Sequence, residues 1–169
     1  MRPDTDTVWR WLAEVPDPEI PVISLTDLGI VRDVAWQDDT LVVTVTPTYS
    51  GCPATTIINL DIETALRHHG IGKLRLDRRL SPPWTTDWIS AAGREKLREF
   101  GIAPPVDGTA ADGRLLGRAR RMAGENLTIA CPRCGSANTE KVSQFGSTPC
   151  KASYRCKDCL EPFDYFKCI

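Results

Sequence analysis

The residues best suited to chemistry are the seven cysteines, six of which lie from position 131 onward. Four of them form two Cys-x-x-Cys pairs, Cys131–Cys134 and Cys156–Cys159, with 21 residues between the pairs. This spacing is typical of a zinc ribbon, in which two tight turns direct four thiolates at one tetrahedral ion. Four thiolates leave no coordination position for water or substrate. The sequence therefore predicts a structural metal site.

The ion and the ligand set both have alternatives. Four thiolates also suit a single iron ion or an iron–sulfur cluster, although the spacing favours zinc. Cys150 and Cys168 lie outside the two pairs. Either one of them replaces a paired cysteine as a ligand, or both pack in the small core. Aromatic residues near the pairs would form that core beside the metal: Phe145, Tyr154, Phe163, Tyr165 and Phe166.

The seventh cysteine, Cys52, lies in the segment Thr48-Tyr-Ser-Gly-Cys-Pro-Ala54. The proline after it suits the first position of a helix, so we expect the Cys52 sulfur at a helix N-terminus. Unpaired amides and the helix dipole favour a thiolate there, which would make Cys52 a better nucleophile or metal ligand. The alternative is a small buried residue at a helix start. These residues alone favour neither interpretation.

Two carboxylates, Asp17 and Glu19, flank Pro18. Beside a thiolate they would be hard ligands or hydrogen-bond acceptors, whereas in a turn Asp17 would accept hydrogen bonds from its own loop. The residues alone favour the turn. His68 and His69 resemble a ligand pair, but they precede Gly70, the expected left-handed cap of their helix. We interpret them as structural, because the helix dipole favours protonated histidine at that end.

Periodic patterns predict the elements that position these residues. We expect a first helix capped by Thr5 or Asp6 and stopped by the prolines of Asp17-Pro-Glu-Ile-Pro21. Alternation and helical spacing predict the remaining elements: strands over 30–36, 41–46 and 73–77, a helix from Pro53 to Gly70, and a helix over 88–100.

Composition limits the domains and the partners. We expect an N-terminal domain over 1–103, a linker over 104–125 rich in Gly, Ala, Pro and charge, and a metal domain over 126–169. The linker arginines are interpreted as a solvated face, because a net charge of −1 gives no case for nucleic acid or a membrane surface. The chain has no apolar export signal and no stretch of roughly 20 apolar residues. A cytoplasmic location with reduced cysteines follows as an expectation.

Several segments together resemble one family. They are Asp17-Pro-Glu-Ile-Pro-Val-Ile-Ser-Leu-Thr-Asp-Leu-Gly-Ile30, the segment around Cys52, Ser81-Pro-Pro-Trp-Thr-Thr-Asp-Trp88 and the cysteine-rich tail. Over nearly its whole length the chain resembles the PaaD (or PaaJ) family of accessory proteins of bacterial phenylacetyl-CoA epoxidase. Its first 103 residues are similar to the iron–sulfur assembly factors that include SufT. The resemblance implies an α+β fold: a small mixed sheet packed with helices, followed by a four-cysteine zinc ribbon.

The resemblance also implies a function. It points to maturation of the iron or iron–sulfur centres of the 1,2-epoxidase in aerobic phenylacetate degradation, without catalytic activity of the chain's own. The alternative is a structural or electron-transfer subunit of that multicomponent oxygenase. The implied partners are its diiron subunit, its reductase with a [2Fe–2S] centre, and iron–sulfur carrier proteins.

The family's reactive cysteine corresponds to Cys52 and its acidic motif to Asp17 and Glu19, which favours a functional Cys52. The implied cargo is iron or a transient iron–sulfur cluster. One cysteine cannot complete a cluster's ligand shell. Asp17, a second copy of the chain in a homodimer, or another protein must therefore supply the remaining ligands.

Overall fold

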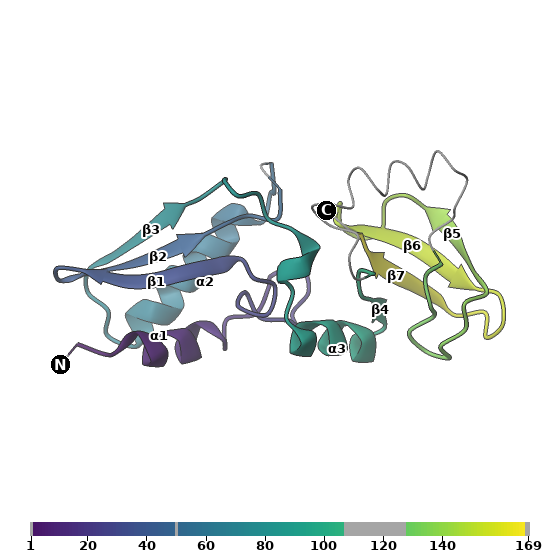
Figure 1. Cartoon of the computed structure of the whole chain (residues 1–169), viewed down its shortest axis with the longest axis horizontal. Coiled ribbons are helices and arrows are strands. Elements are labelled where there is room, and N and C mark those ends of the chain that lie inside the picture. Colours follow the sequence, from purple (N-terminus) through teal and green to yellow (C-terminus); the bar gives the residue numbers. More distant parts are fainter. Residues whose placement is uncertain (1, 50, 107–127, 168–169) are drawn as a thin grey trace. The chain divides into compact units, whose positions relative to one another are not determined.

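The computed structural model describes residues 2–49, 51–106 and 128–167, which form two compact units. The first unit comprises Met1–Trp84 and Trp88–Gly93, and the second comprises Thr85–Asp87 and Arg94–Ile169. Figure 1 labels the elements of both. Most of the predicted linker over 104–125, with its arginines, lies outside the described residues. The predicted domain ranges therefore stay a prediction.

The first unit contains a three-stranded mixed sheet in the order β1-β2-β3. Strand β1 (Val31–Gln37) is antiparallel to β2 (Thr40–Val45), and β3 (Leu74–Arg78) is parallel to β2. Parallel neighbours need a crossover connection, which is usually a helix, and α2 (Thr55–His68) provides it. The small mixed sheet packed with helices, expected from the sequence, is confirmed.

The first helix, α1 (Thr5–Leu12), begins one residue earlier than its predicted cap allows. Asp4 is the N-cap, because its backbone is extended and its carboxylate accepts a hydrogen bond of 2.6 Å from the amide of Thr7. The predicted caps, Thr5 and Asp6, lie inside the helix instead. The prediction was wrong by one or two positions because all three residues can cap a helix.

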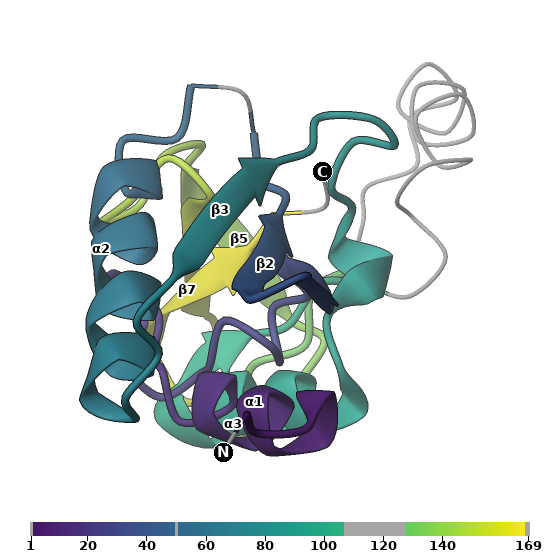
Figure 2. The ribbon, with the colours of Figure 1, turned by 90° about the vertical axis from the view of Figure 1, so that its left-hand side faces the viewer.

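The core of the first unit lies between the helices and one face of the sheet. Figures 1 and 2 show α2 alongside the sheet. Gly70 follows α2 with a φ of +84°, so the predicted left-handed cap is confirmed. Apolar side chains from both helices and from the central strand are fully buried in this core: Val8 and Leu12 of α1, Ile62 and Leu66 of α2, and Leu41 and Val43 of β2.

The second unit contains a four-stranded sheet in the order β4-β7-β6-β5. Strands β5 (Thr139–Ser143), β6 (Lys151–Cys156) and β7 (Pro162–Phe166) form an antiparallel ribbon. Helix α3 (Ala91–Phe100) leads into β4 (Ile102–Ala103), which pairs in parallel with β7. A two-residue strand from before residue 107 thus completes the sheet of the ribbon.

The core of the second unit is largely the aromatic core expected from the sequence. Tyr154, Phe163, Tyr165 and Phe166 are at most 8% exposed, and the Tyr154 ring stacks against Phe163 at 5.9 Å between centroids. Phe145 is the exception, with 66% of its surface exposed beside the ammonium of Lys167. Its expected place in the core is wrong, because it lies in the loop after β5 and not on the packed face of a strand.

Candidate functional site

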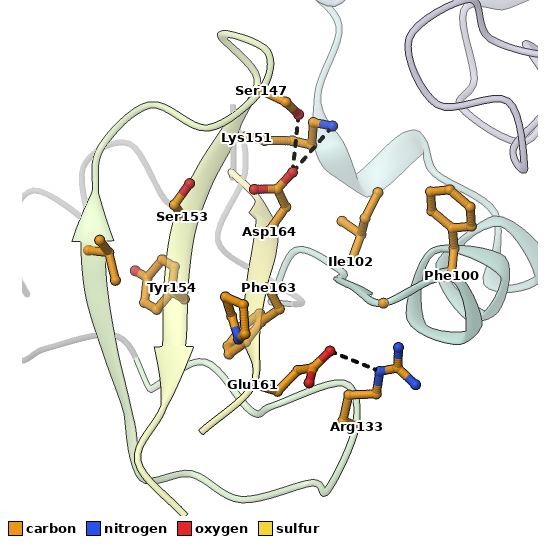
Figure 3. Close-up of a pocket in the computed structure, with 13 residues that line it drawn as sticks. Phe100, Ile102, Arg133, Ser147, Lys151, Ser153, Tyr154, Glu161, Phe163 and Asp164 are labelled. Atoms are coloured by element: carbon orange, nitrogen blue, oxygen red, sulfur yellow. Dashed lines mark hydrogen bonds and ion pairs between the residues drawn. The ribbon is translucent and has the colours of Figure 1, made fainter. Parts of the chain in front are cut away.

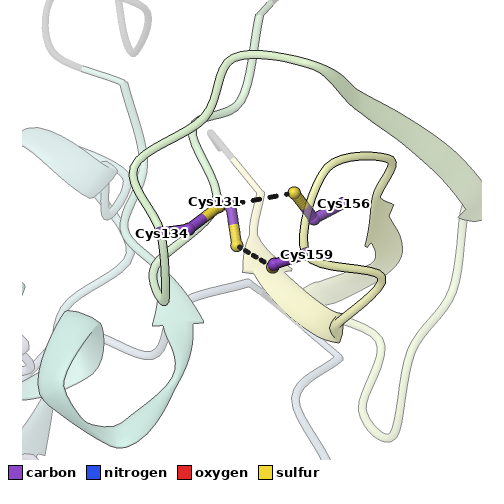
Figure 4. Close-up of side chains that lie close together, drawn as sticks. All are labelled: Cys131, Cys134, Cys156 and Cys159. Atoms are coloured by element: carbon purple, nitrogen blue, oxygen red, sulfur yellow. Dashed lines mark hydrogen bonds between the residues drawn. The ribbon is translucent and has the colours of Figure 1, made fainter.

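The two Cys-x-x-Cys pairs meet at one end of the second unit's sheet. Cys131 and Cys134 precede β5, whereas Cys156 ends β6 and Cys159 lies in the turn before β7. Their four Sγ atoms lie within 4.8 Å of one another. Figure 4 shows the four side chains drawn together. The structure therefore brings together the four cysteines that the sequence paired.

The separations between the sulfur atoms fit a shared metal ion. Cys131 Sγ lies 3.7 Å from Cys159 Sγ, and Cys134 Sγ lies 3.6 Å from Cys156 Sγ. Zinc–sulfur bonds of about 2.3 Å in a tetrahedron place sulfurs about 3.8 Å apart. A disulfide would need about 2.05 Å, and all four cysteines are free thiols. This donor set fits a tetrahedral ion bound by four thiolates.

The backbone of each turn directs amides at the sulfurs. Gly135 and Leu160 follow the two pairs with φ angles of +74° and +64°, and this left-handed conformation curls the chain around each pair. The backbone amides of Cys159 and then Asp158 lower the pKa of Cys156 to about 7. A lower pKa favours the thiolate, which is the form that binds metal. Burial and the neighbouring thiols instead raise the pKa of Cys134 and of Cys159. Among these three cysteines, the local structure therefore favours the thiolate at Cys156.

The two further thiols of the tail lie outside this four-sulfur group. Cys150 is buried in the turn before β6, with its Sγ 3.1 Å from the Oγ1 of Thr148. Cys168 lies outside the described residues. Any role of either thiol as a metal ligand stays a prediction.

In the first unit, three loops leave the sheet at the same end. Val31 of β1 pairs with Val45 of β2, and Val45 pairs with Arg78 of β3. Consequently the loop before β1, the loop after β2 and the loop after β3 all meet the sheet at the same end of its strands. This region is called the sheet end. Figure 1 shows these three loops at one end of the unit. Asp17, Glu19 and Cys52 all lie on these loops.

Buried hydrogen bonds tie the three loops to one another. The amide of Thr46 donates to the carbonyl of Ile30 at 2.8 Å, which joins the loops after β2 and before β1. The indole of Trp84 donates to the carbonyl of Leu28 at 2.9 Å, and the hydroxyl of Ser90 donates to Asp27 at 2.7 Å. These contacts fix the loop after β3 against the loop before β1. The sheet end is therefore an ordered surface.

Cys52 is half-buried in the loop between β2 and α2. Its amide donates to the carbonyl of Tyr49 at 3.1 Å, and its own carbonyl accepts hydrogen bonds from the amide and hydroxyl of Thr55 at 3.2 and 2.9 Å. Because these bonds form a turn, α2 begins at Thr55. The sequence predicted that Pro53 is the first residue of this helix. This prediction is wrong, because α2 begins two residues later. Cys52 lies in the turn that leads into α2, and no side chain caps the first amides of that helix.

The two carboxylates of the acidic motif have different surroundings. Asp17 is 6% exposed, and its Oδ1 accepts hydrogen bonds from the amides of Glu19 and Ile20 at 2.9 and 2.8 Å. Asp17 therefore organises its own loop, as the turn interpretation predicts. Glu19 is half-buried, and in the described part of the chain its carboxylate makes no hydrogen bond or ion pair. Glu19 is the carboxylate with free acceptor capacity.

Sequence reasoning missed one polar side chain at this sheet end. Thr46 follows β2 and is 1% exposed, and its Oγ1 has no hydrogen-bond partner among the described residues. An unpaired buried hydroxyl is costly, which makes Thr46 a candidate for contact with a bound group. The available signal was a polar residue at the carboxyl end of a strand that is otherwise buried.

The second unit also has a pocket of about 520 Å³, shown in Figure 3. Lys151 and Asp164 form an ion pair of 3.4 Å on one side of it, and Arg133 and Glu161 form one of 3.5 Å on the other. Ser147 donates to the same carboxylate of Asp164. Each cation of the pocket is paired with a carboxylate, and none of the residues predicted for a site lines it.

Two family models match successive parts of the chain. Residues 5–72 match the model described as "Iron-sulfur cluster assembly protein", and residues 117–167 match the "PaaD zinc beta ribbon domain". A crystal structure from Bacillus anthracis, of a domain of unknown function termed DUF59, is similar over 54% of this chain and 89% of its own. Its TM-score is 0.51 and its identity 26%. Fold and site thus define an iron–sulfur assembly domain joined to a four-cysteine zinc ribbon.

Two relatives narrow this class. A protein of Porphyromonas gingivalis (strain ATCC BAA-308 / W83), named "Fe-S protein maturation auxiliary factor", is 33% identical over 57% of this chain and 90% of its own. A protein of Escherichia coli (strain K12), named as one subunit of a "Putative 1,2-phenylacetyl-CoA epoxidase", is 46% identical over 99% of this chain and 94% of its own. The chain belongs to the PaaD family. None of the helices in its described part has the length and apolar character needed to cross a membrane.

Proposed function

We propose that the chain is an accessory factor that matures iron or iron–sulfur centres of phenylacetyl-CoA 1,2-epoxidase in aerobic phenylacetate degradation. The observation that carries the proposal is the combination of two modules in one chain. The first resembles iron–sulfur cluster assembly proteins, and the whole chain resembles a protein named as a subunit of that epoxidase. A chain that carries an iron–sulfur assembly domain and also resembles an epoxidase subunit is suited to bring iron–sulfur chemistry to this oxygenase.

In this proposal Cys52 transiently binds iron or an iron–sulfur cluster as cargo. Its thiol is half-buried on a loop of the ordered sheet end, where the Oγ1 of Thr46 has no partner among the described residues. One cysteine cannot complete a cluster's ligand shell. Asp17 already accepts two amide hydrogen bonds. The missing ligands therefore come from a carrier protein, from the client, or from a second copy of the chain.

The ribbon has a separate role in the proposal. Zinc bound by Cys131, Cys134, Cys156 and Cys159 has a complete shell, so the ion would maintain the shape of the module without taking part in chemistry. The surface of that module would then recognise the reductase or the diiron subunit of the epoxidase. Free thiols at six described cysteines fit the cytoplasm, where thiols are kept reduced.

The test is maturation of the epoxidase in cells that carry either wild-type protein or Cys52→Ser. We expect the Cys52→Ser protein to keep its fold and its zinc, while the epoxidase purified from those cells lacks iron and activity. Glu19→Gln, at the same sheet end, shows whether the Glu19 carboxylate, which has no partner among the described residues, is also needed. Fully active, iron-replete epoxidase with Cys52→Ser would refute the role of Cys52.

The second candidate is a permanent subunit of the oxygenase, either structural or for electron transfer. It is favoured by the word "subunit" in the name of the Escherichia coli relative and by the ability of four thiolates to bind iron. Stripping this chain from already matured epoxidase separates the two candidates. Activity that survives its removal supports the maturation role, and activity that is lost and then restored on adding the chain supports the subunit.

A further inference from the structure

Hydrogen bonds join the two Cys-x-x-Cys turns of the ribbon without passing through the metal. Asp158 lies inside the second pair, and its carboxylate accepts hydrogen bonds from the Oγ of Ser136 and from the Nδ2 of Asn138. The bond from Asn138 measures 2.7 Å. Ser136 and Asn138 both follow the first pair closely. The amide of Lys157 also donates to the carbonyl of Asn138 at 2.8 Å.

The placement of one turn against the other determines the geometry of the sulfur site. Both short sulfur–sulfur separations, Cys131–Cys159 and Cys134–Cys156, connect a sulfur of the first turn with a sulfur of the second. Any slip between the turns would therefore lengthen or shorten both separations at once. The side chain of Asp158 crosses this same junction through its hydrogen bonds with Ser136 and Asn138.

We propose that Asp158 is a positioning residue that locks the two turns together and thereby slows release of the ribbon's ion. This inference rests on the proposed occupancy of the ribbon by zinc. Thiolates leave a bound ion one after another, and the site opens only when the turns separate. The charge-assisted hydrogen bonds that Ser136 and Asn138 donate to the Asp158 carboxylate must break before the turns can part.

Slow release of zinc would matter if the first unit binds iron as cargo, as proposed above. The hydrogen bonds of Asp158 with Ser136 and Asn138 are called the lock below. A four-thiolate site binds iron as well as zinc, so a site that opened readily would exchange its zinc for the cargo. Slow opening keeps the resident ion separate from the transferred one. Asp158 would thus contribute to metal specificity through kinetics, without belonging to the group of four cysteines that would bind the ion.

The experiment uses the full-length, zinc-loaded protein and measures the rate of zinc transfer to excess 4-(2-pyridylazo)resorcinol. Asp158→Ala should release zinc about tenfold faster or more, the size typical of losing an outer-shell partner. Asp158→Asn keeps an oxygen acceptor and should restore most of the retention. Lys157→Ala is the matched control, because it lies in the same turn and, among the described residues, its side chain loses only the exposed ion pair with Glu140.

Cobalt(II) substitution reports on the geometry of the four thiolates through its visible absorption bands. A general loss of stability without displacement of the turns would not change these bands. With the turns misplaced, the visible bands of the tetrahedral cobalt–thiolate centre should shift or lose intensity in Asp158→Ala and remain unchanged in Lys157→Ala. If Asp158→Ala does not fold, Ser136→Ala removes one hydrogen bond of the lock and should release zinc a fewfold faster. Wild-type rates and spectra in Asp158→Ala, or in Ser136→Ala where only that variant folds, would overturn the role of Asp158. A wild-type protein without zinc would overturn the zinc assignment, and this inference with it.

Discussion

The two sulfur-bearing regions of the molecule are built in opposite ways. In the ribbon, four thiols converge within 4.8 Å, and hydrogen bonds of Asp158 join their two turns. At the sheet end of the first unit, Cys52 is a single half-buried thiol in a turn. A complete shell suits an ion that stays, whereas an incomplete shell suits a cargo that must leave. In the proposed function, the number of ligands would therefore separate a resident metal from a transferred one.

The largest effect is expected from breaking the complete shell. Cys156→Ser removes the sulfur of a residue that is 0% exposed and belongs to the core of the second unit. Because metal binding supplies much of the folding free energy of such ribbons, we expect loss of zinc and of the ordered fold of β5–β7. Elemental analysis and amide hydrogen exchange measure the two effects.

Cys150→Ser is the matched control for this prediction, because Cys150 is a buried thiol of the same unit outside the four-sulfur group. It should keep one zinc per chain. A folded, zinc-replete Cys156→Ser protein would show that the four-thiolate site is not the metal site.

An intermediate effect is expected at the acidic motif of the first unit. Asp17→Ala leaves the amides of Glu19 and Ile20 without their acceptor in a buried loop, which should cost about 2 kcal/mol of the free energy of unfolding. Glu19→Gln changes a carboxylate without a described partner and should cost less than about 0.5 kcal/mol.

Urea unfolding of the first unit measures both changes, and epoxidase maturation is assayed beside it. Equal stability losses would contradict the division between a structural Asp17 and an available Glu19. Failed maturation by a stable Glu19→Gln protein would instead assign Glu19 to the cargo site.

An effect smaller than that of Asp17→Ala is expected from a pair of matched glycines, one in each unit. Gly70 and Gly135 have φ angles of +84° and +74°, and a Cβ at either position meets nothing within 4 Å. Alanine at either should therefore cost only the backbone strain of the left-handed conformation, about 1 kcal/mol. Gly70→Ala should destabilise the first unit with zinc release unchanged, whereas Gly135→Ala should accelerate zinc release a fewfold. Zinc release that responds to Gly70→Ala would show that the two units do not behave independently.

The sequence predicted the features that depend on local pattern. The three strands of the first unit, the left-handed Gly70 and the grouping of the four ribbon cysteines follow from periodicity and spacing, and the structure confirms them. The family resemblance implied that the strands form a mixed sheet, which the structure also confirms. Strand β4 was missed because two residues carry no periodic signal, and its pairing with β7 joins distant parts of the chain. Likewise, nothing local shows that Asp158 meets Ser136, since the fold brings them together across 22 positions.

The most direct test of the division between resident and transferred metal is elemental analysis with an absorption spectrum on anaerobically purified protein. It compares the wild type, Cys52→Ser and Cys156→Ser. We expect one zinc per chain in the wild type and in Cys52→Ser, with iron–sulfur absorption in the wild type that is lost in Cys52→Ser. Iron that persists in Cys52→Ser and disappears in Cys156→Ser would make the ribbon the iron site and contradict a transferred metal at Cys52.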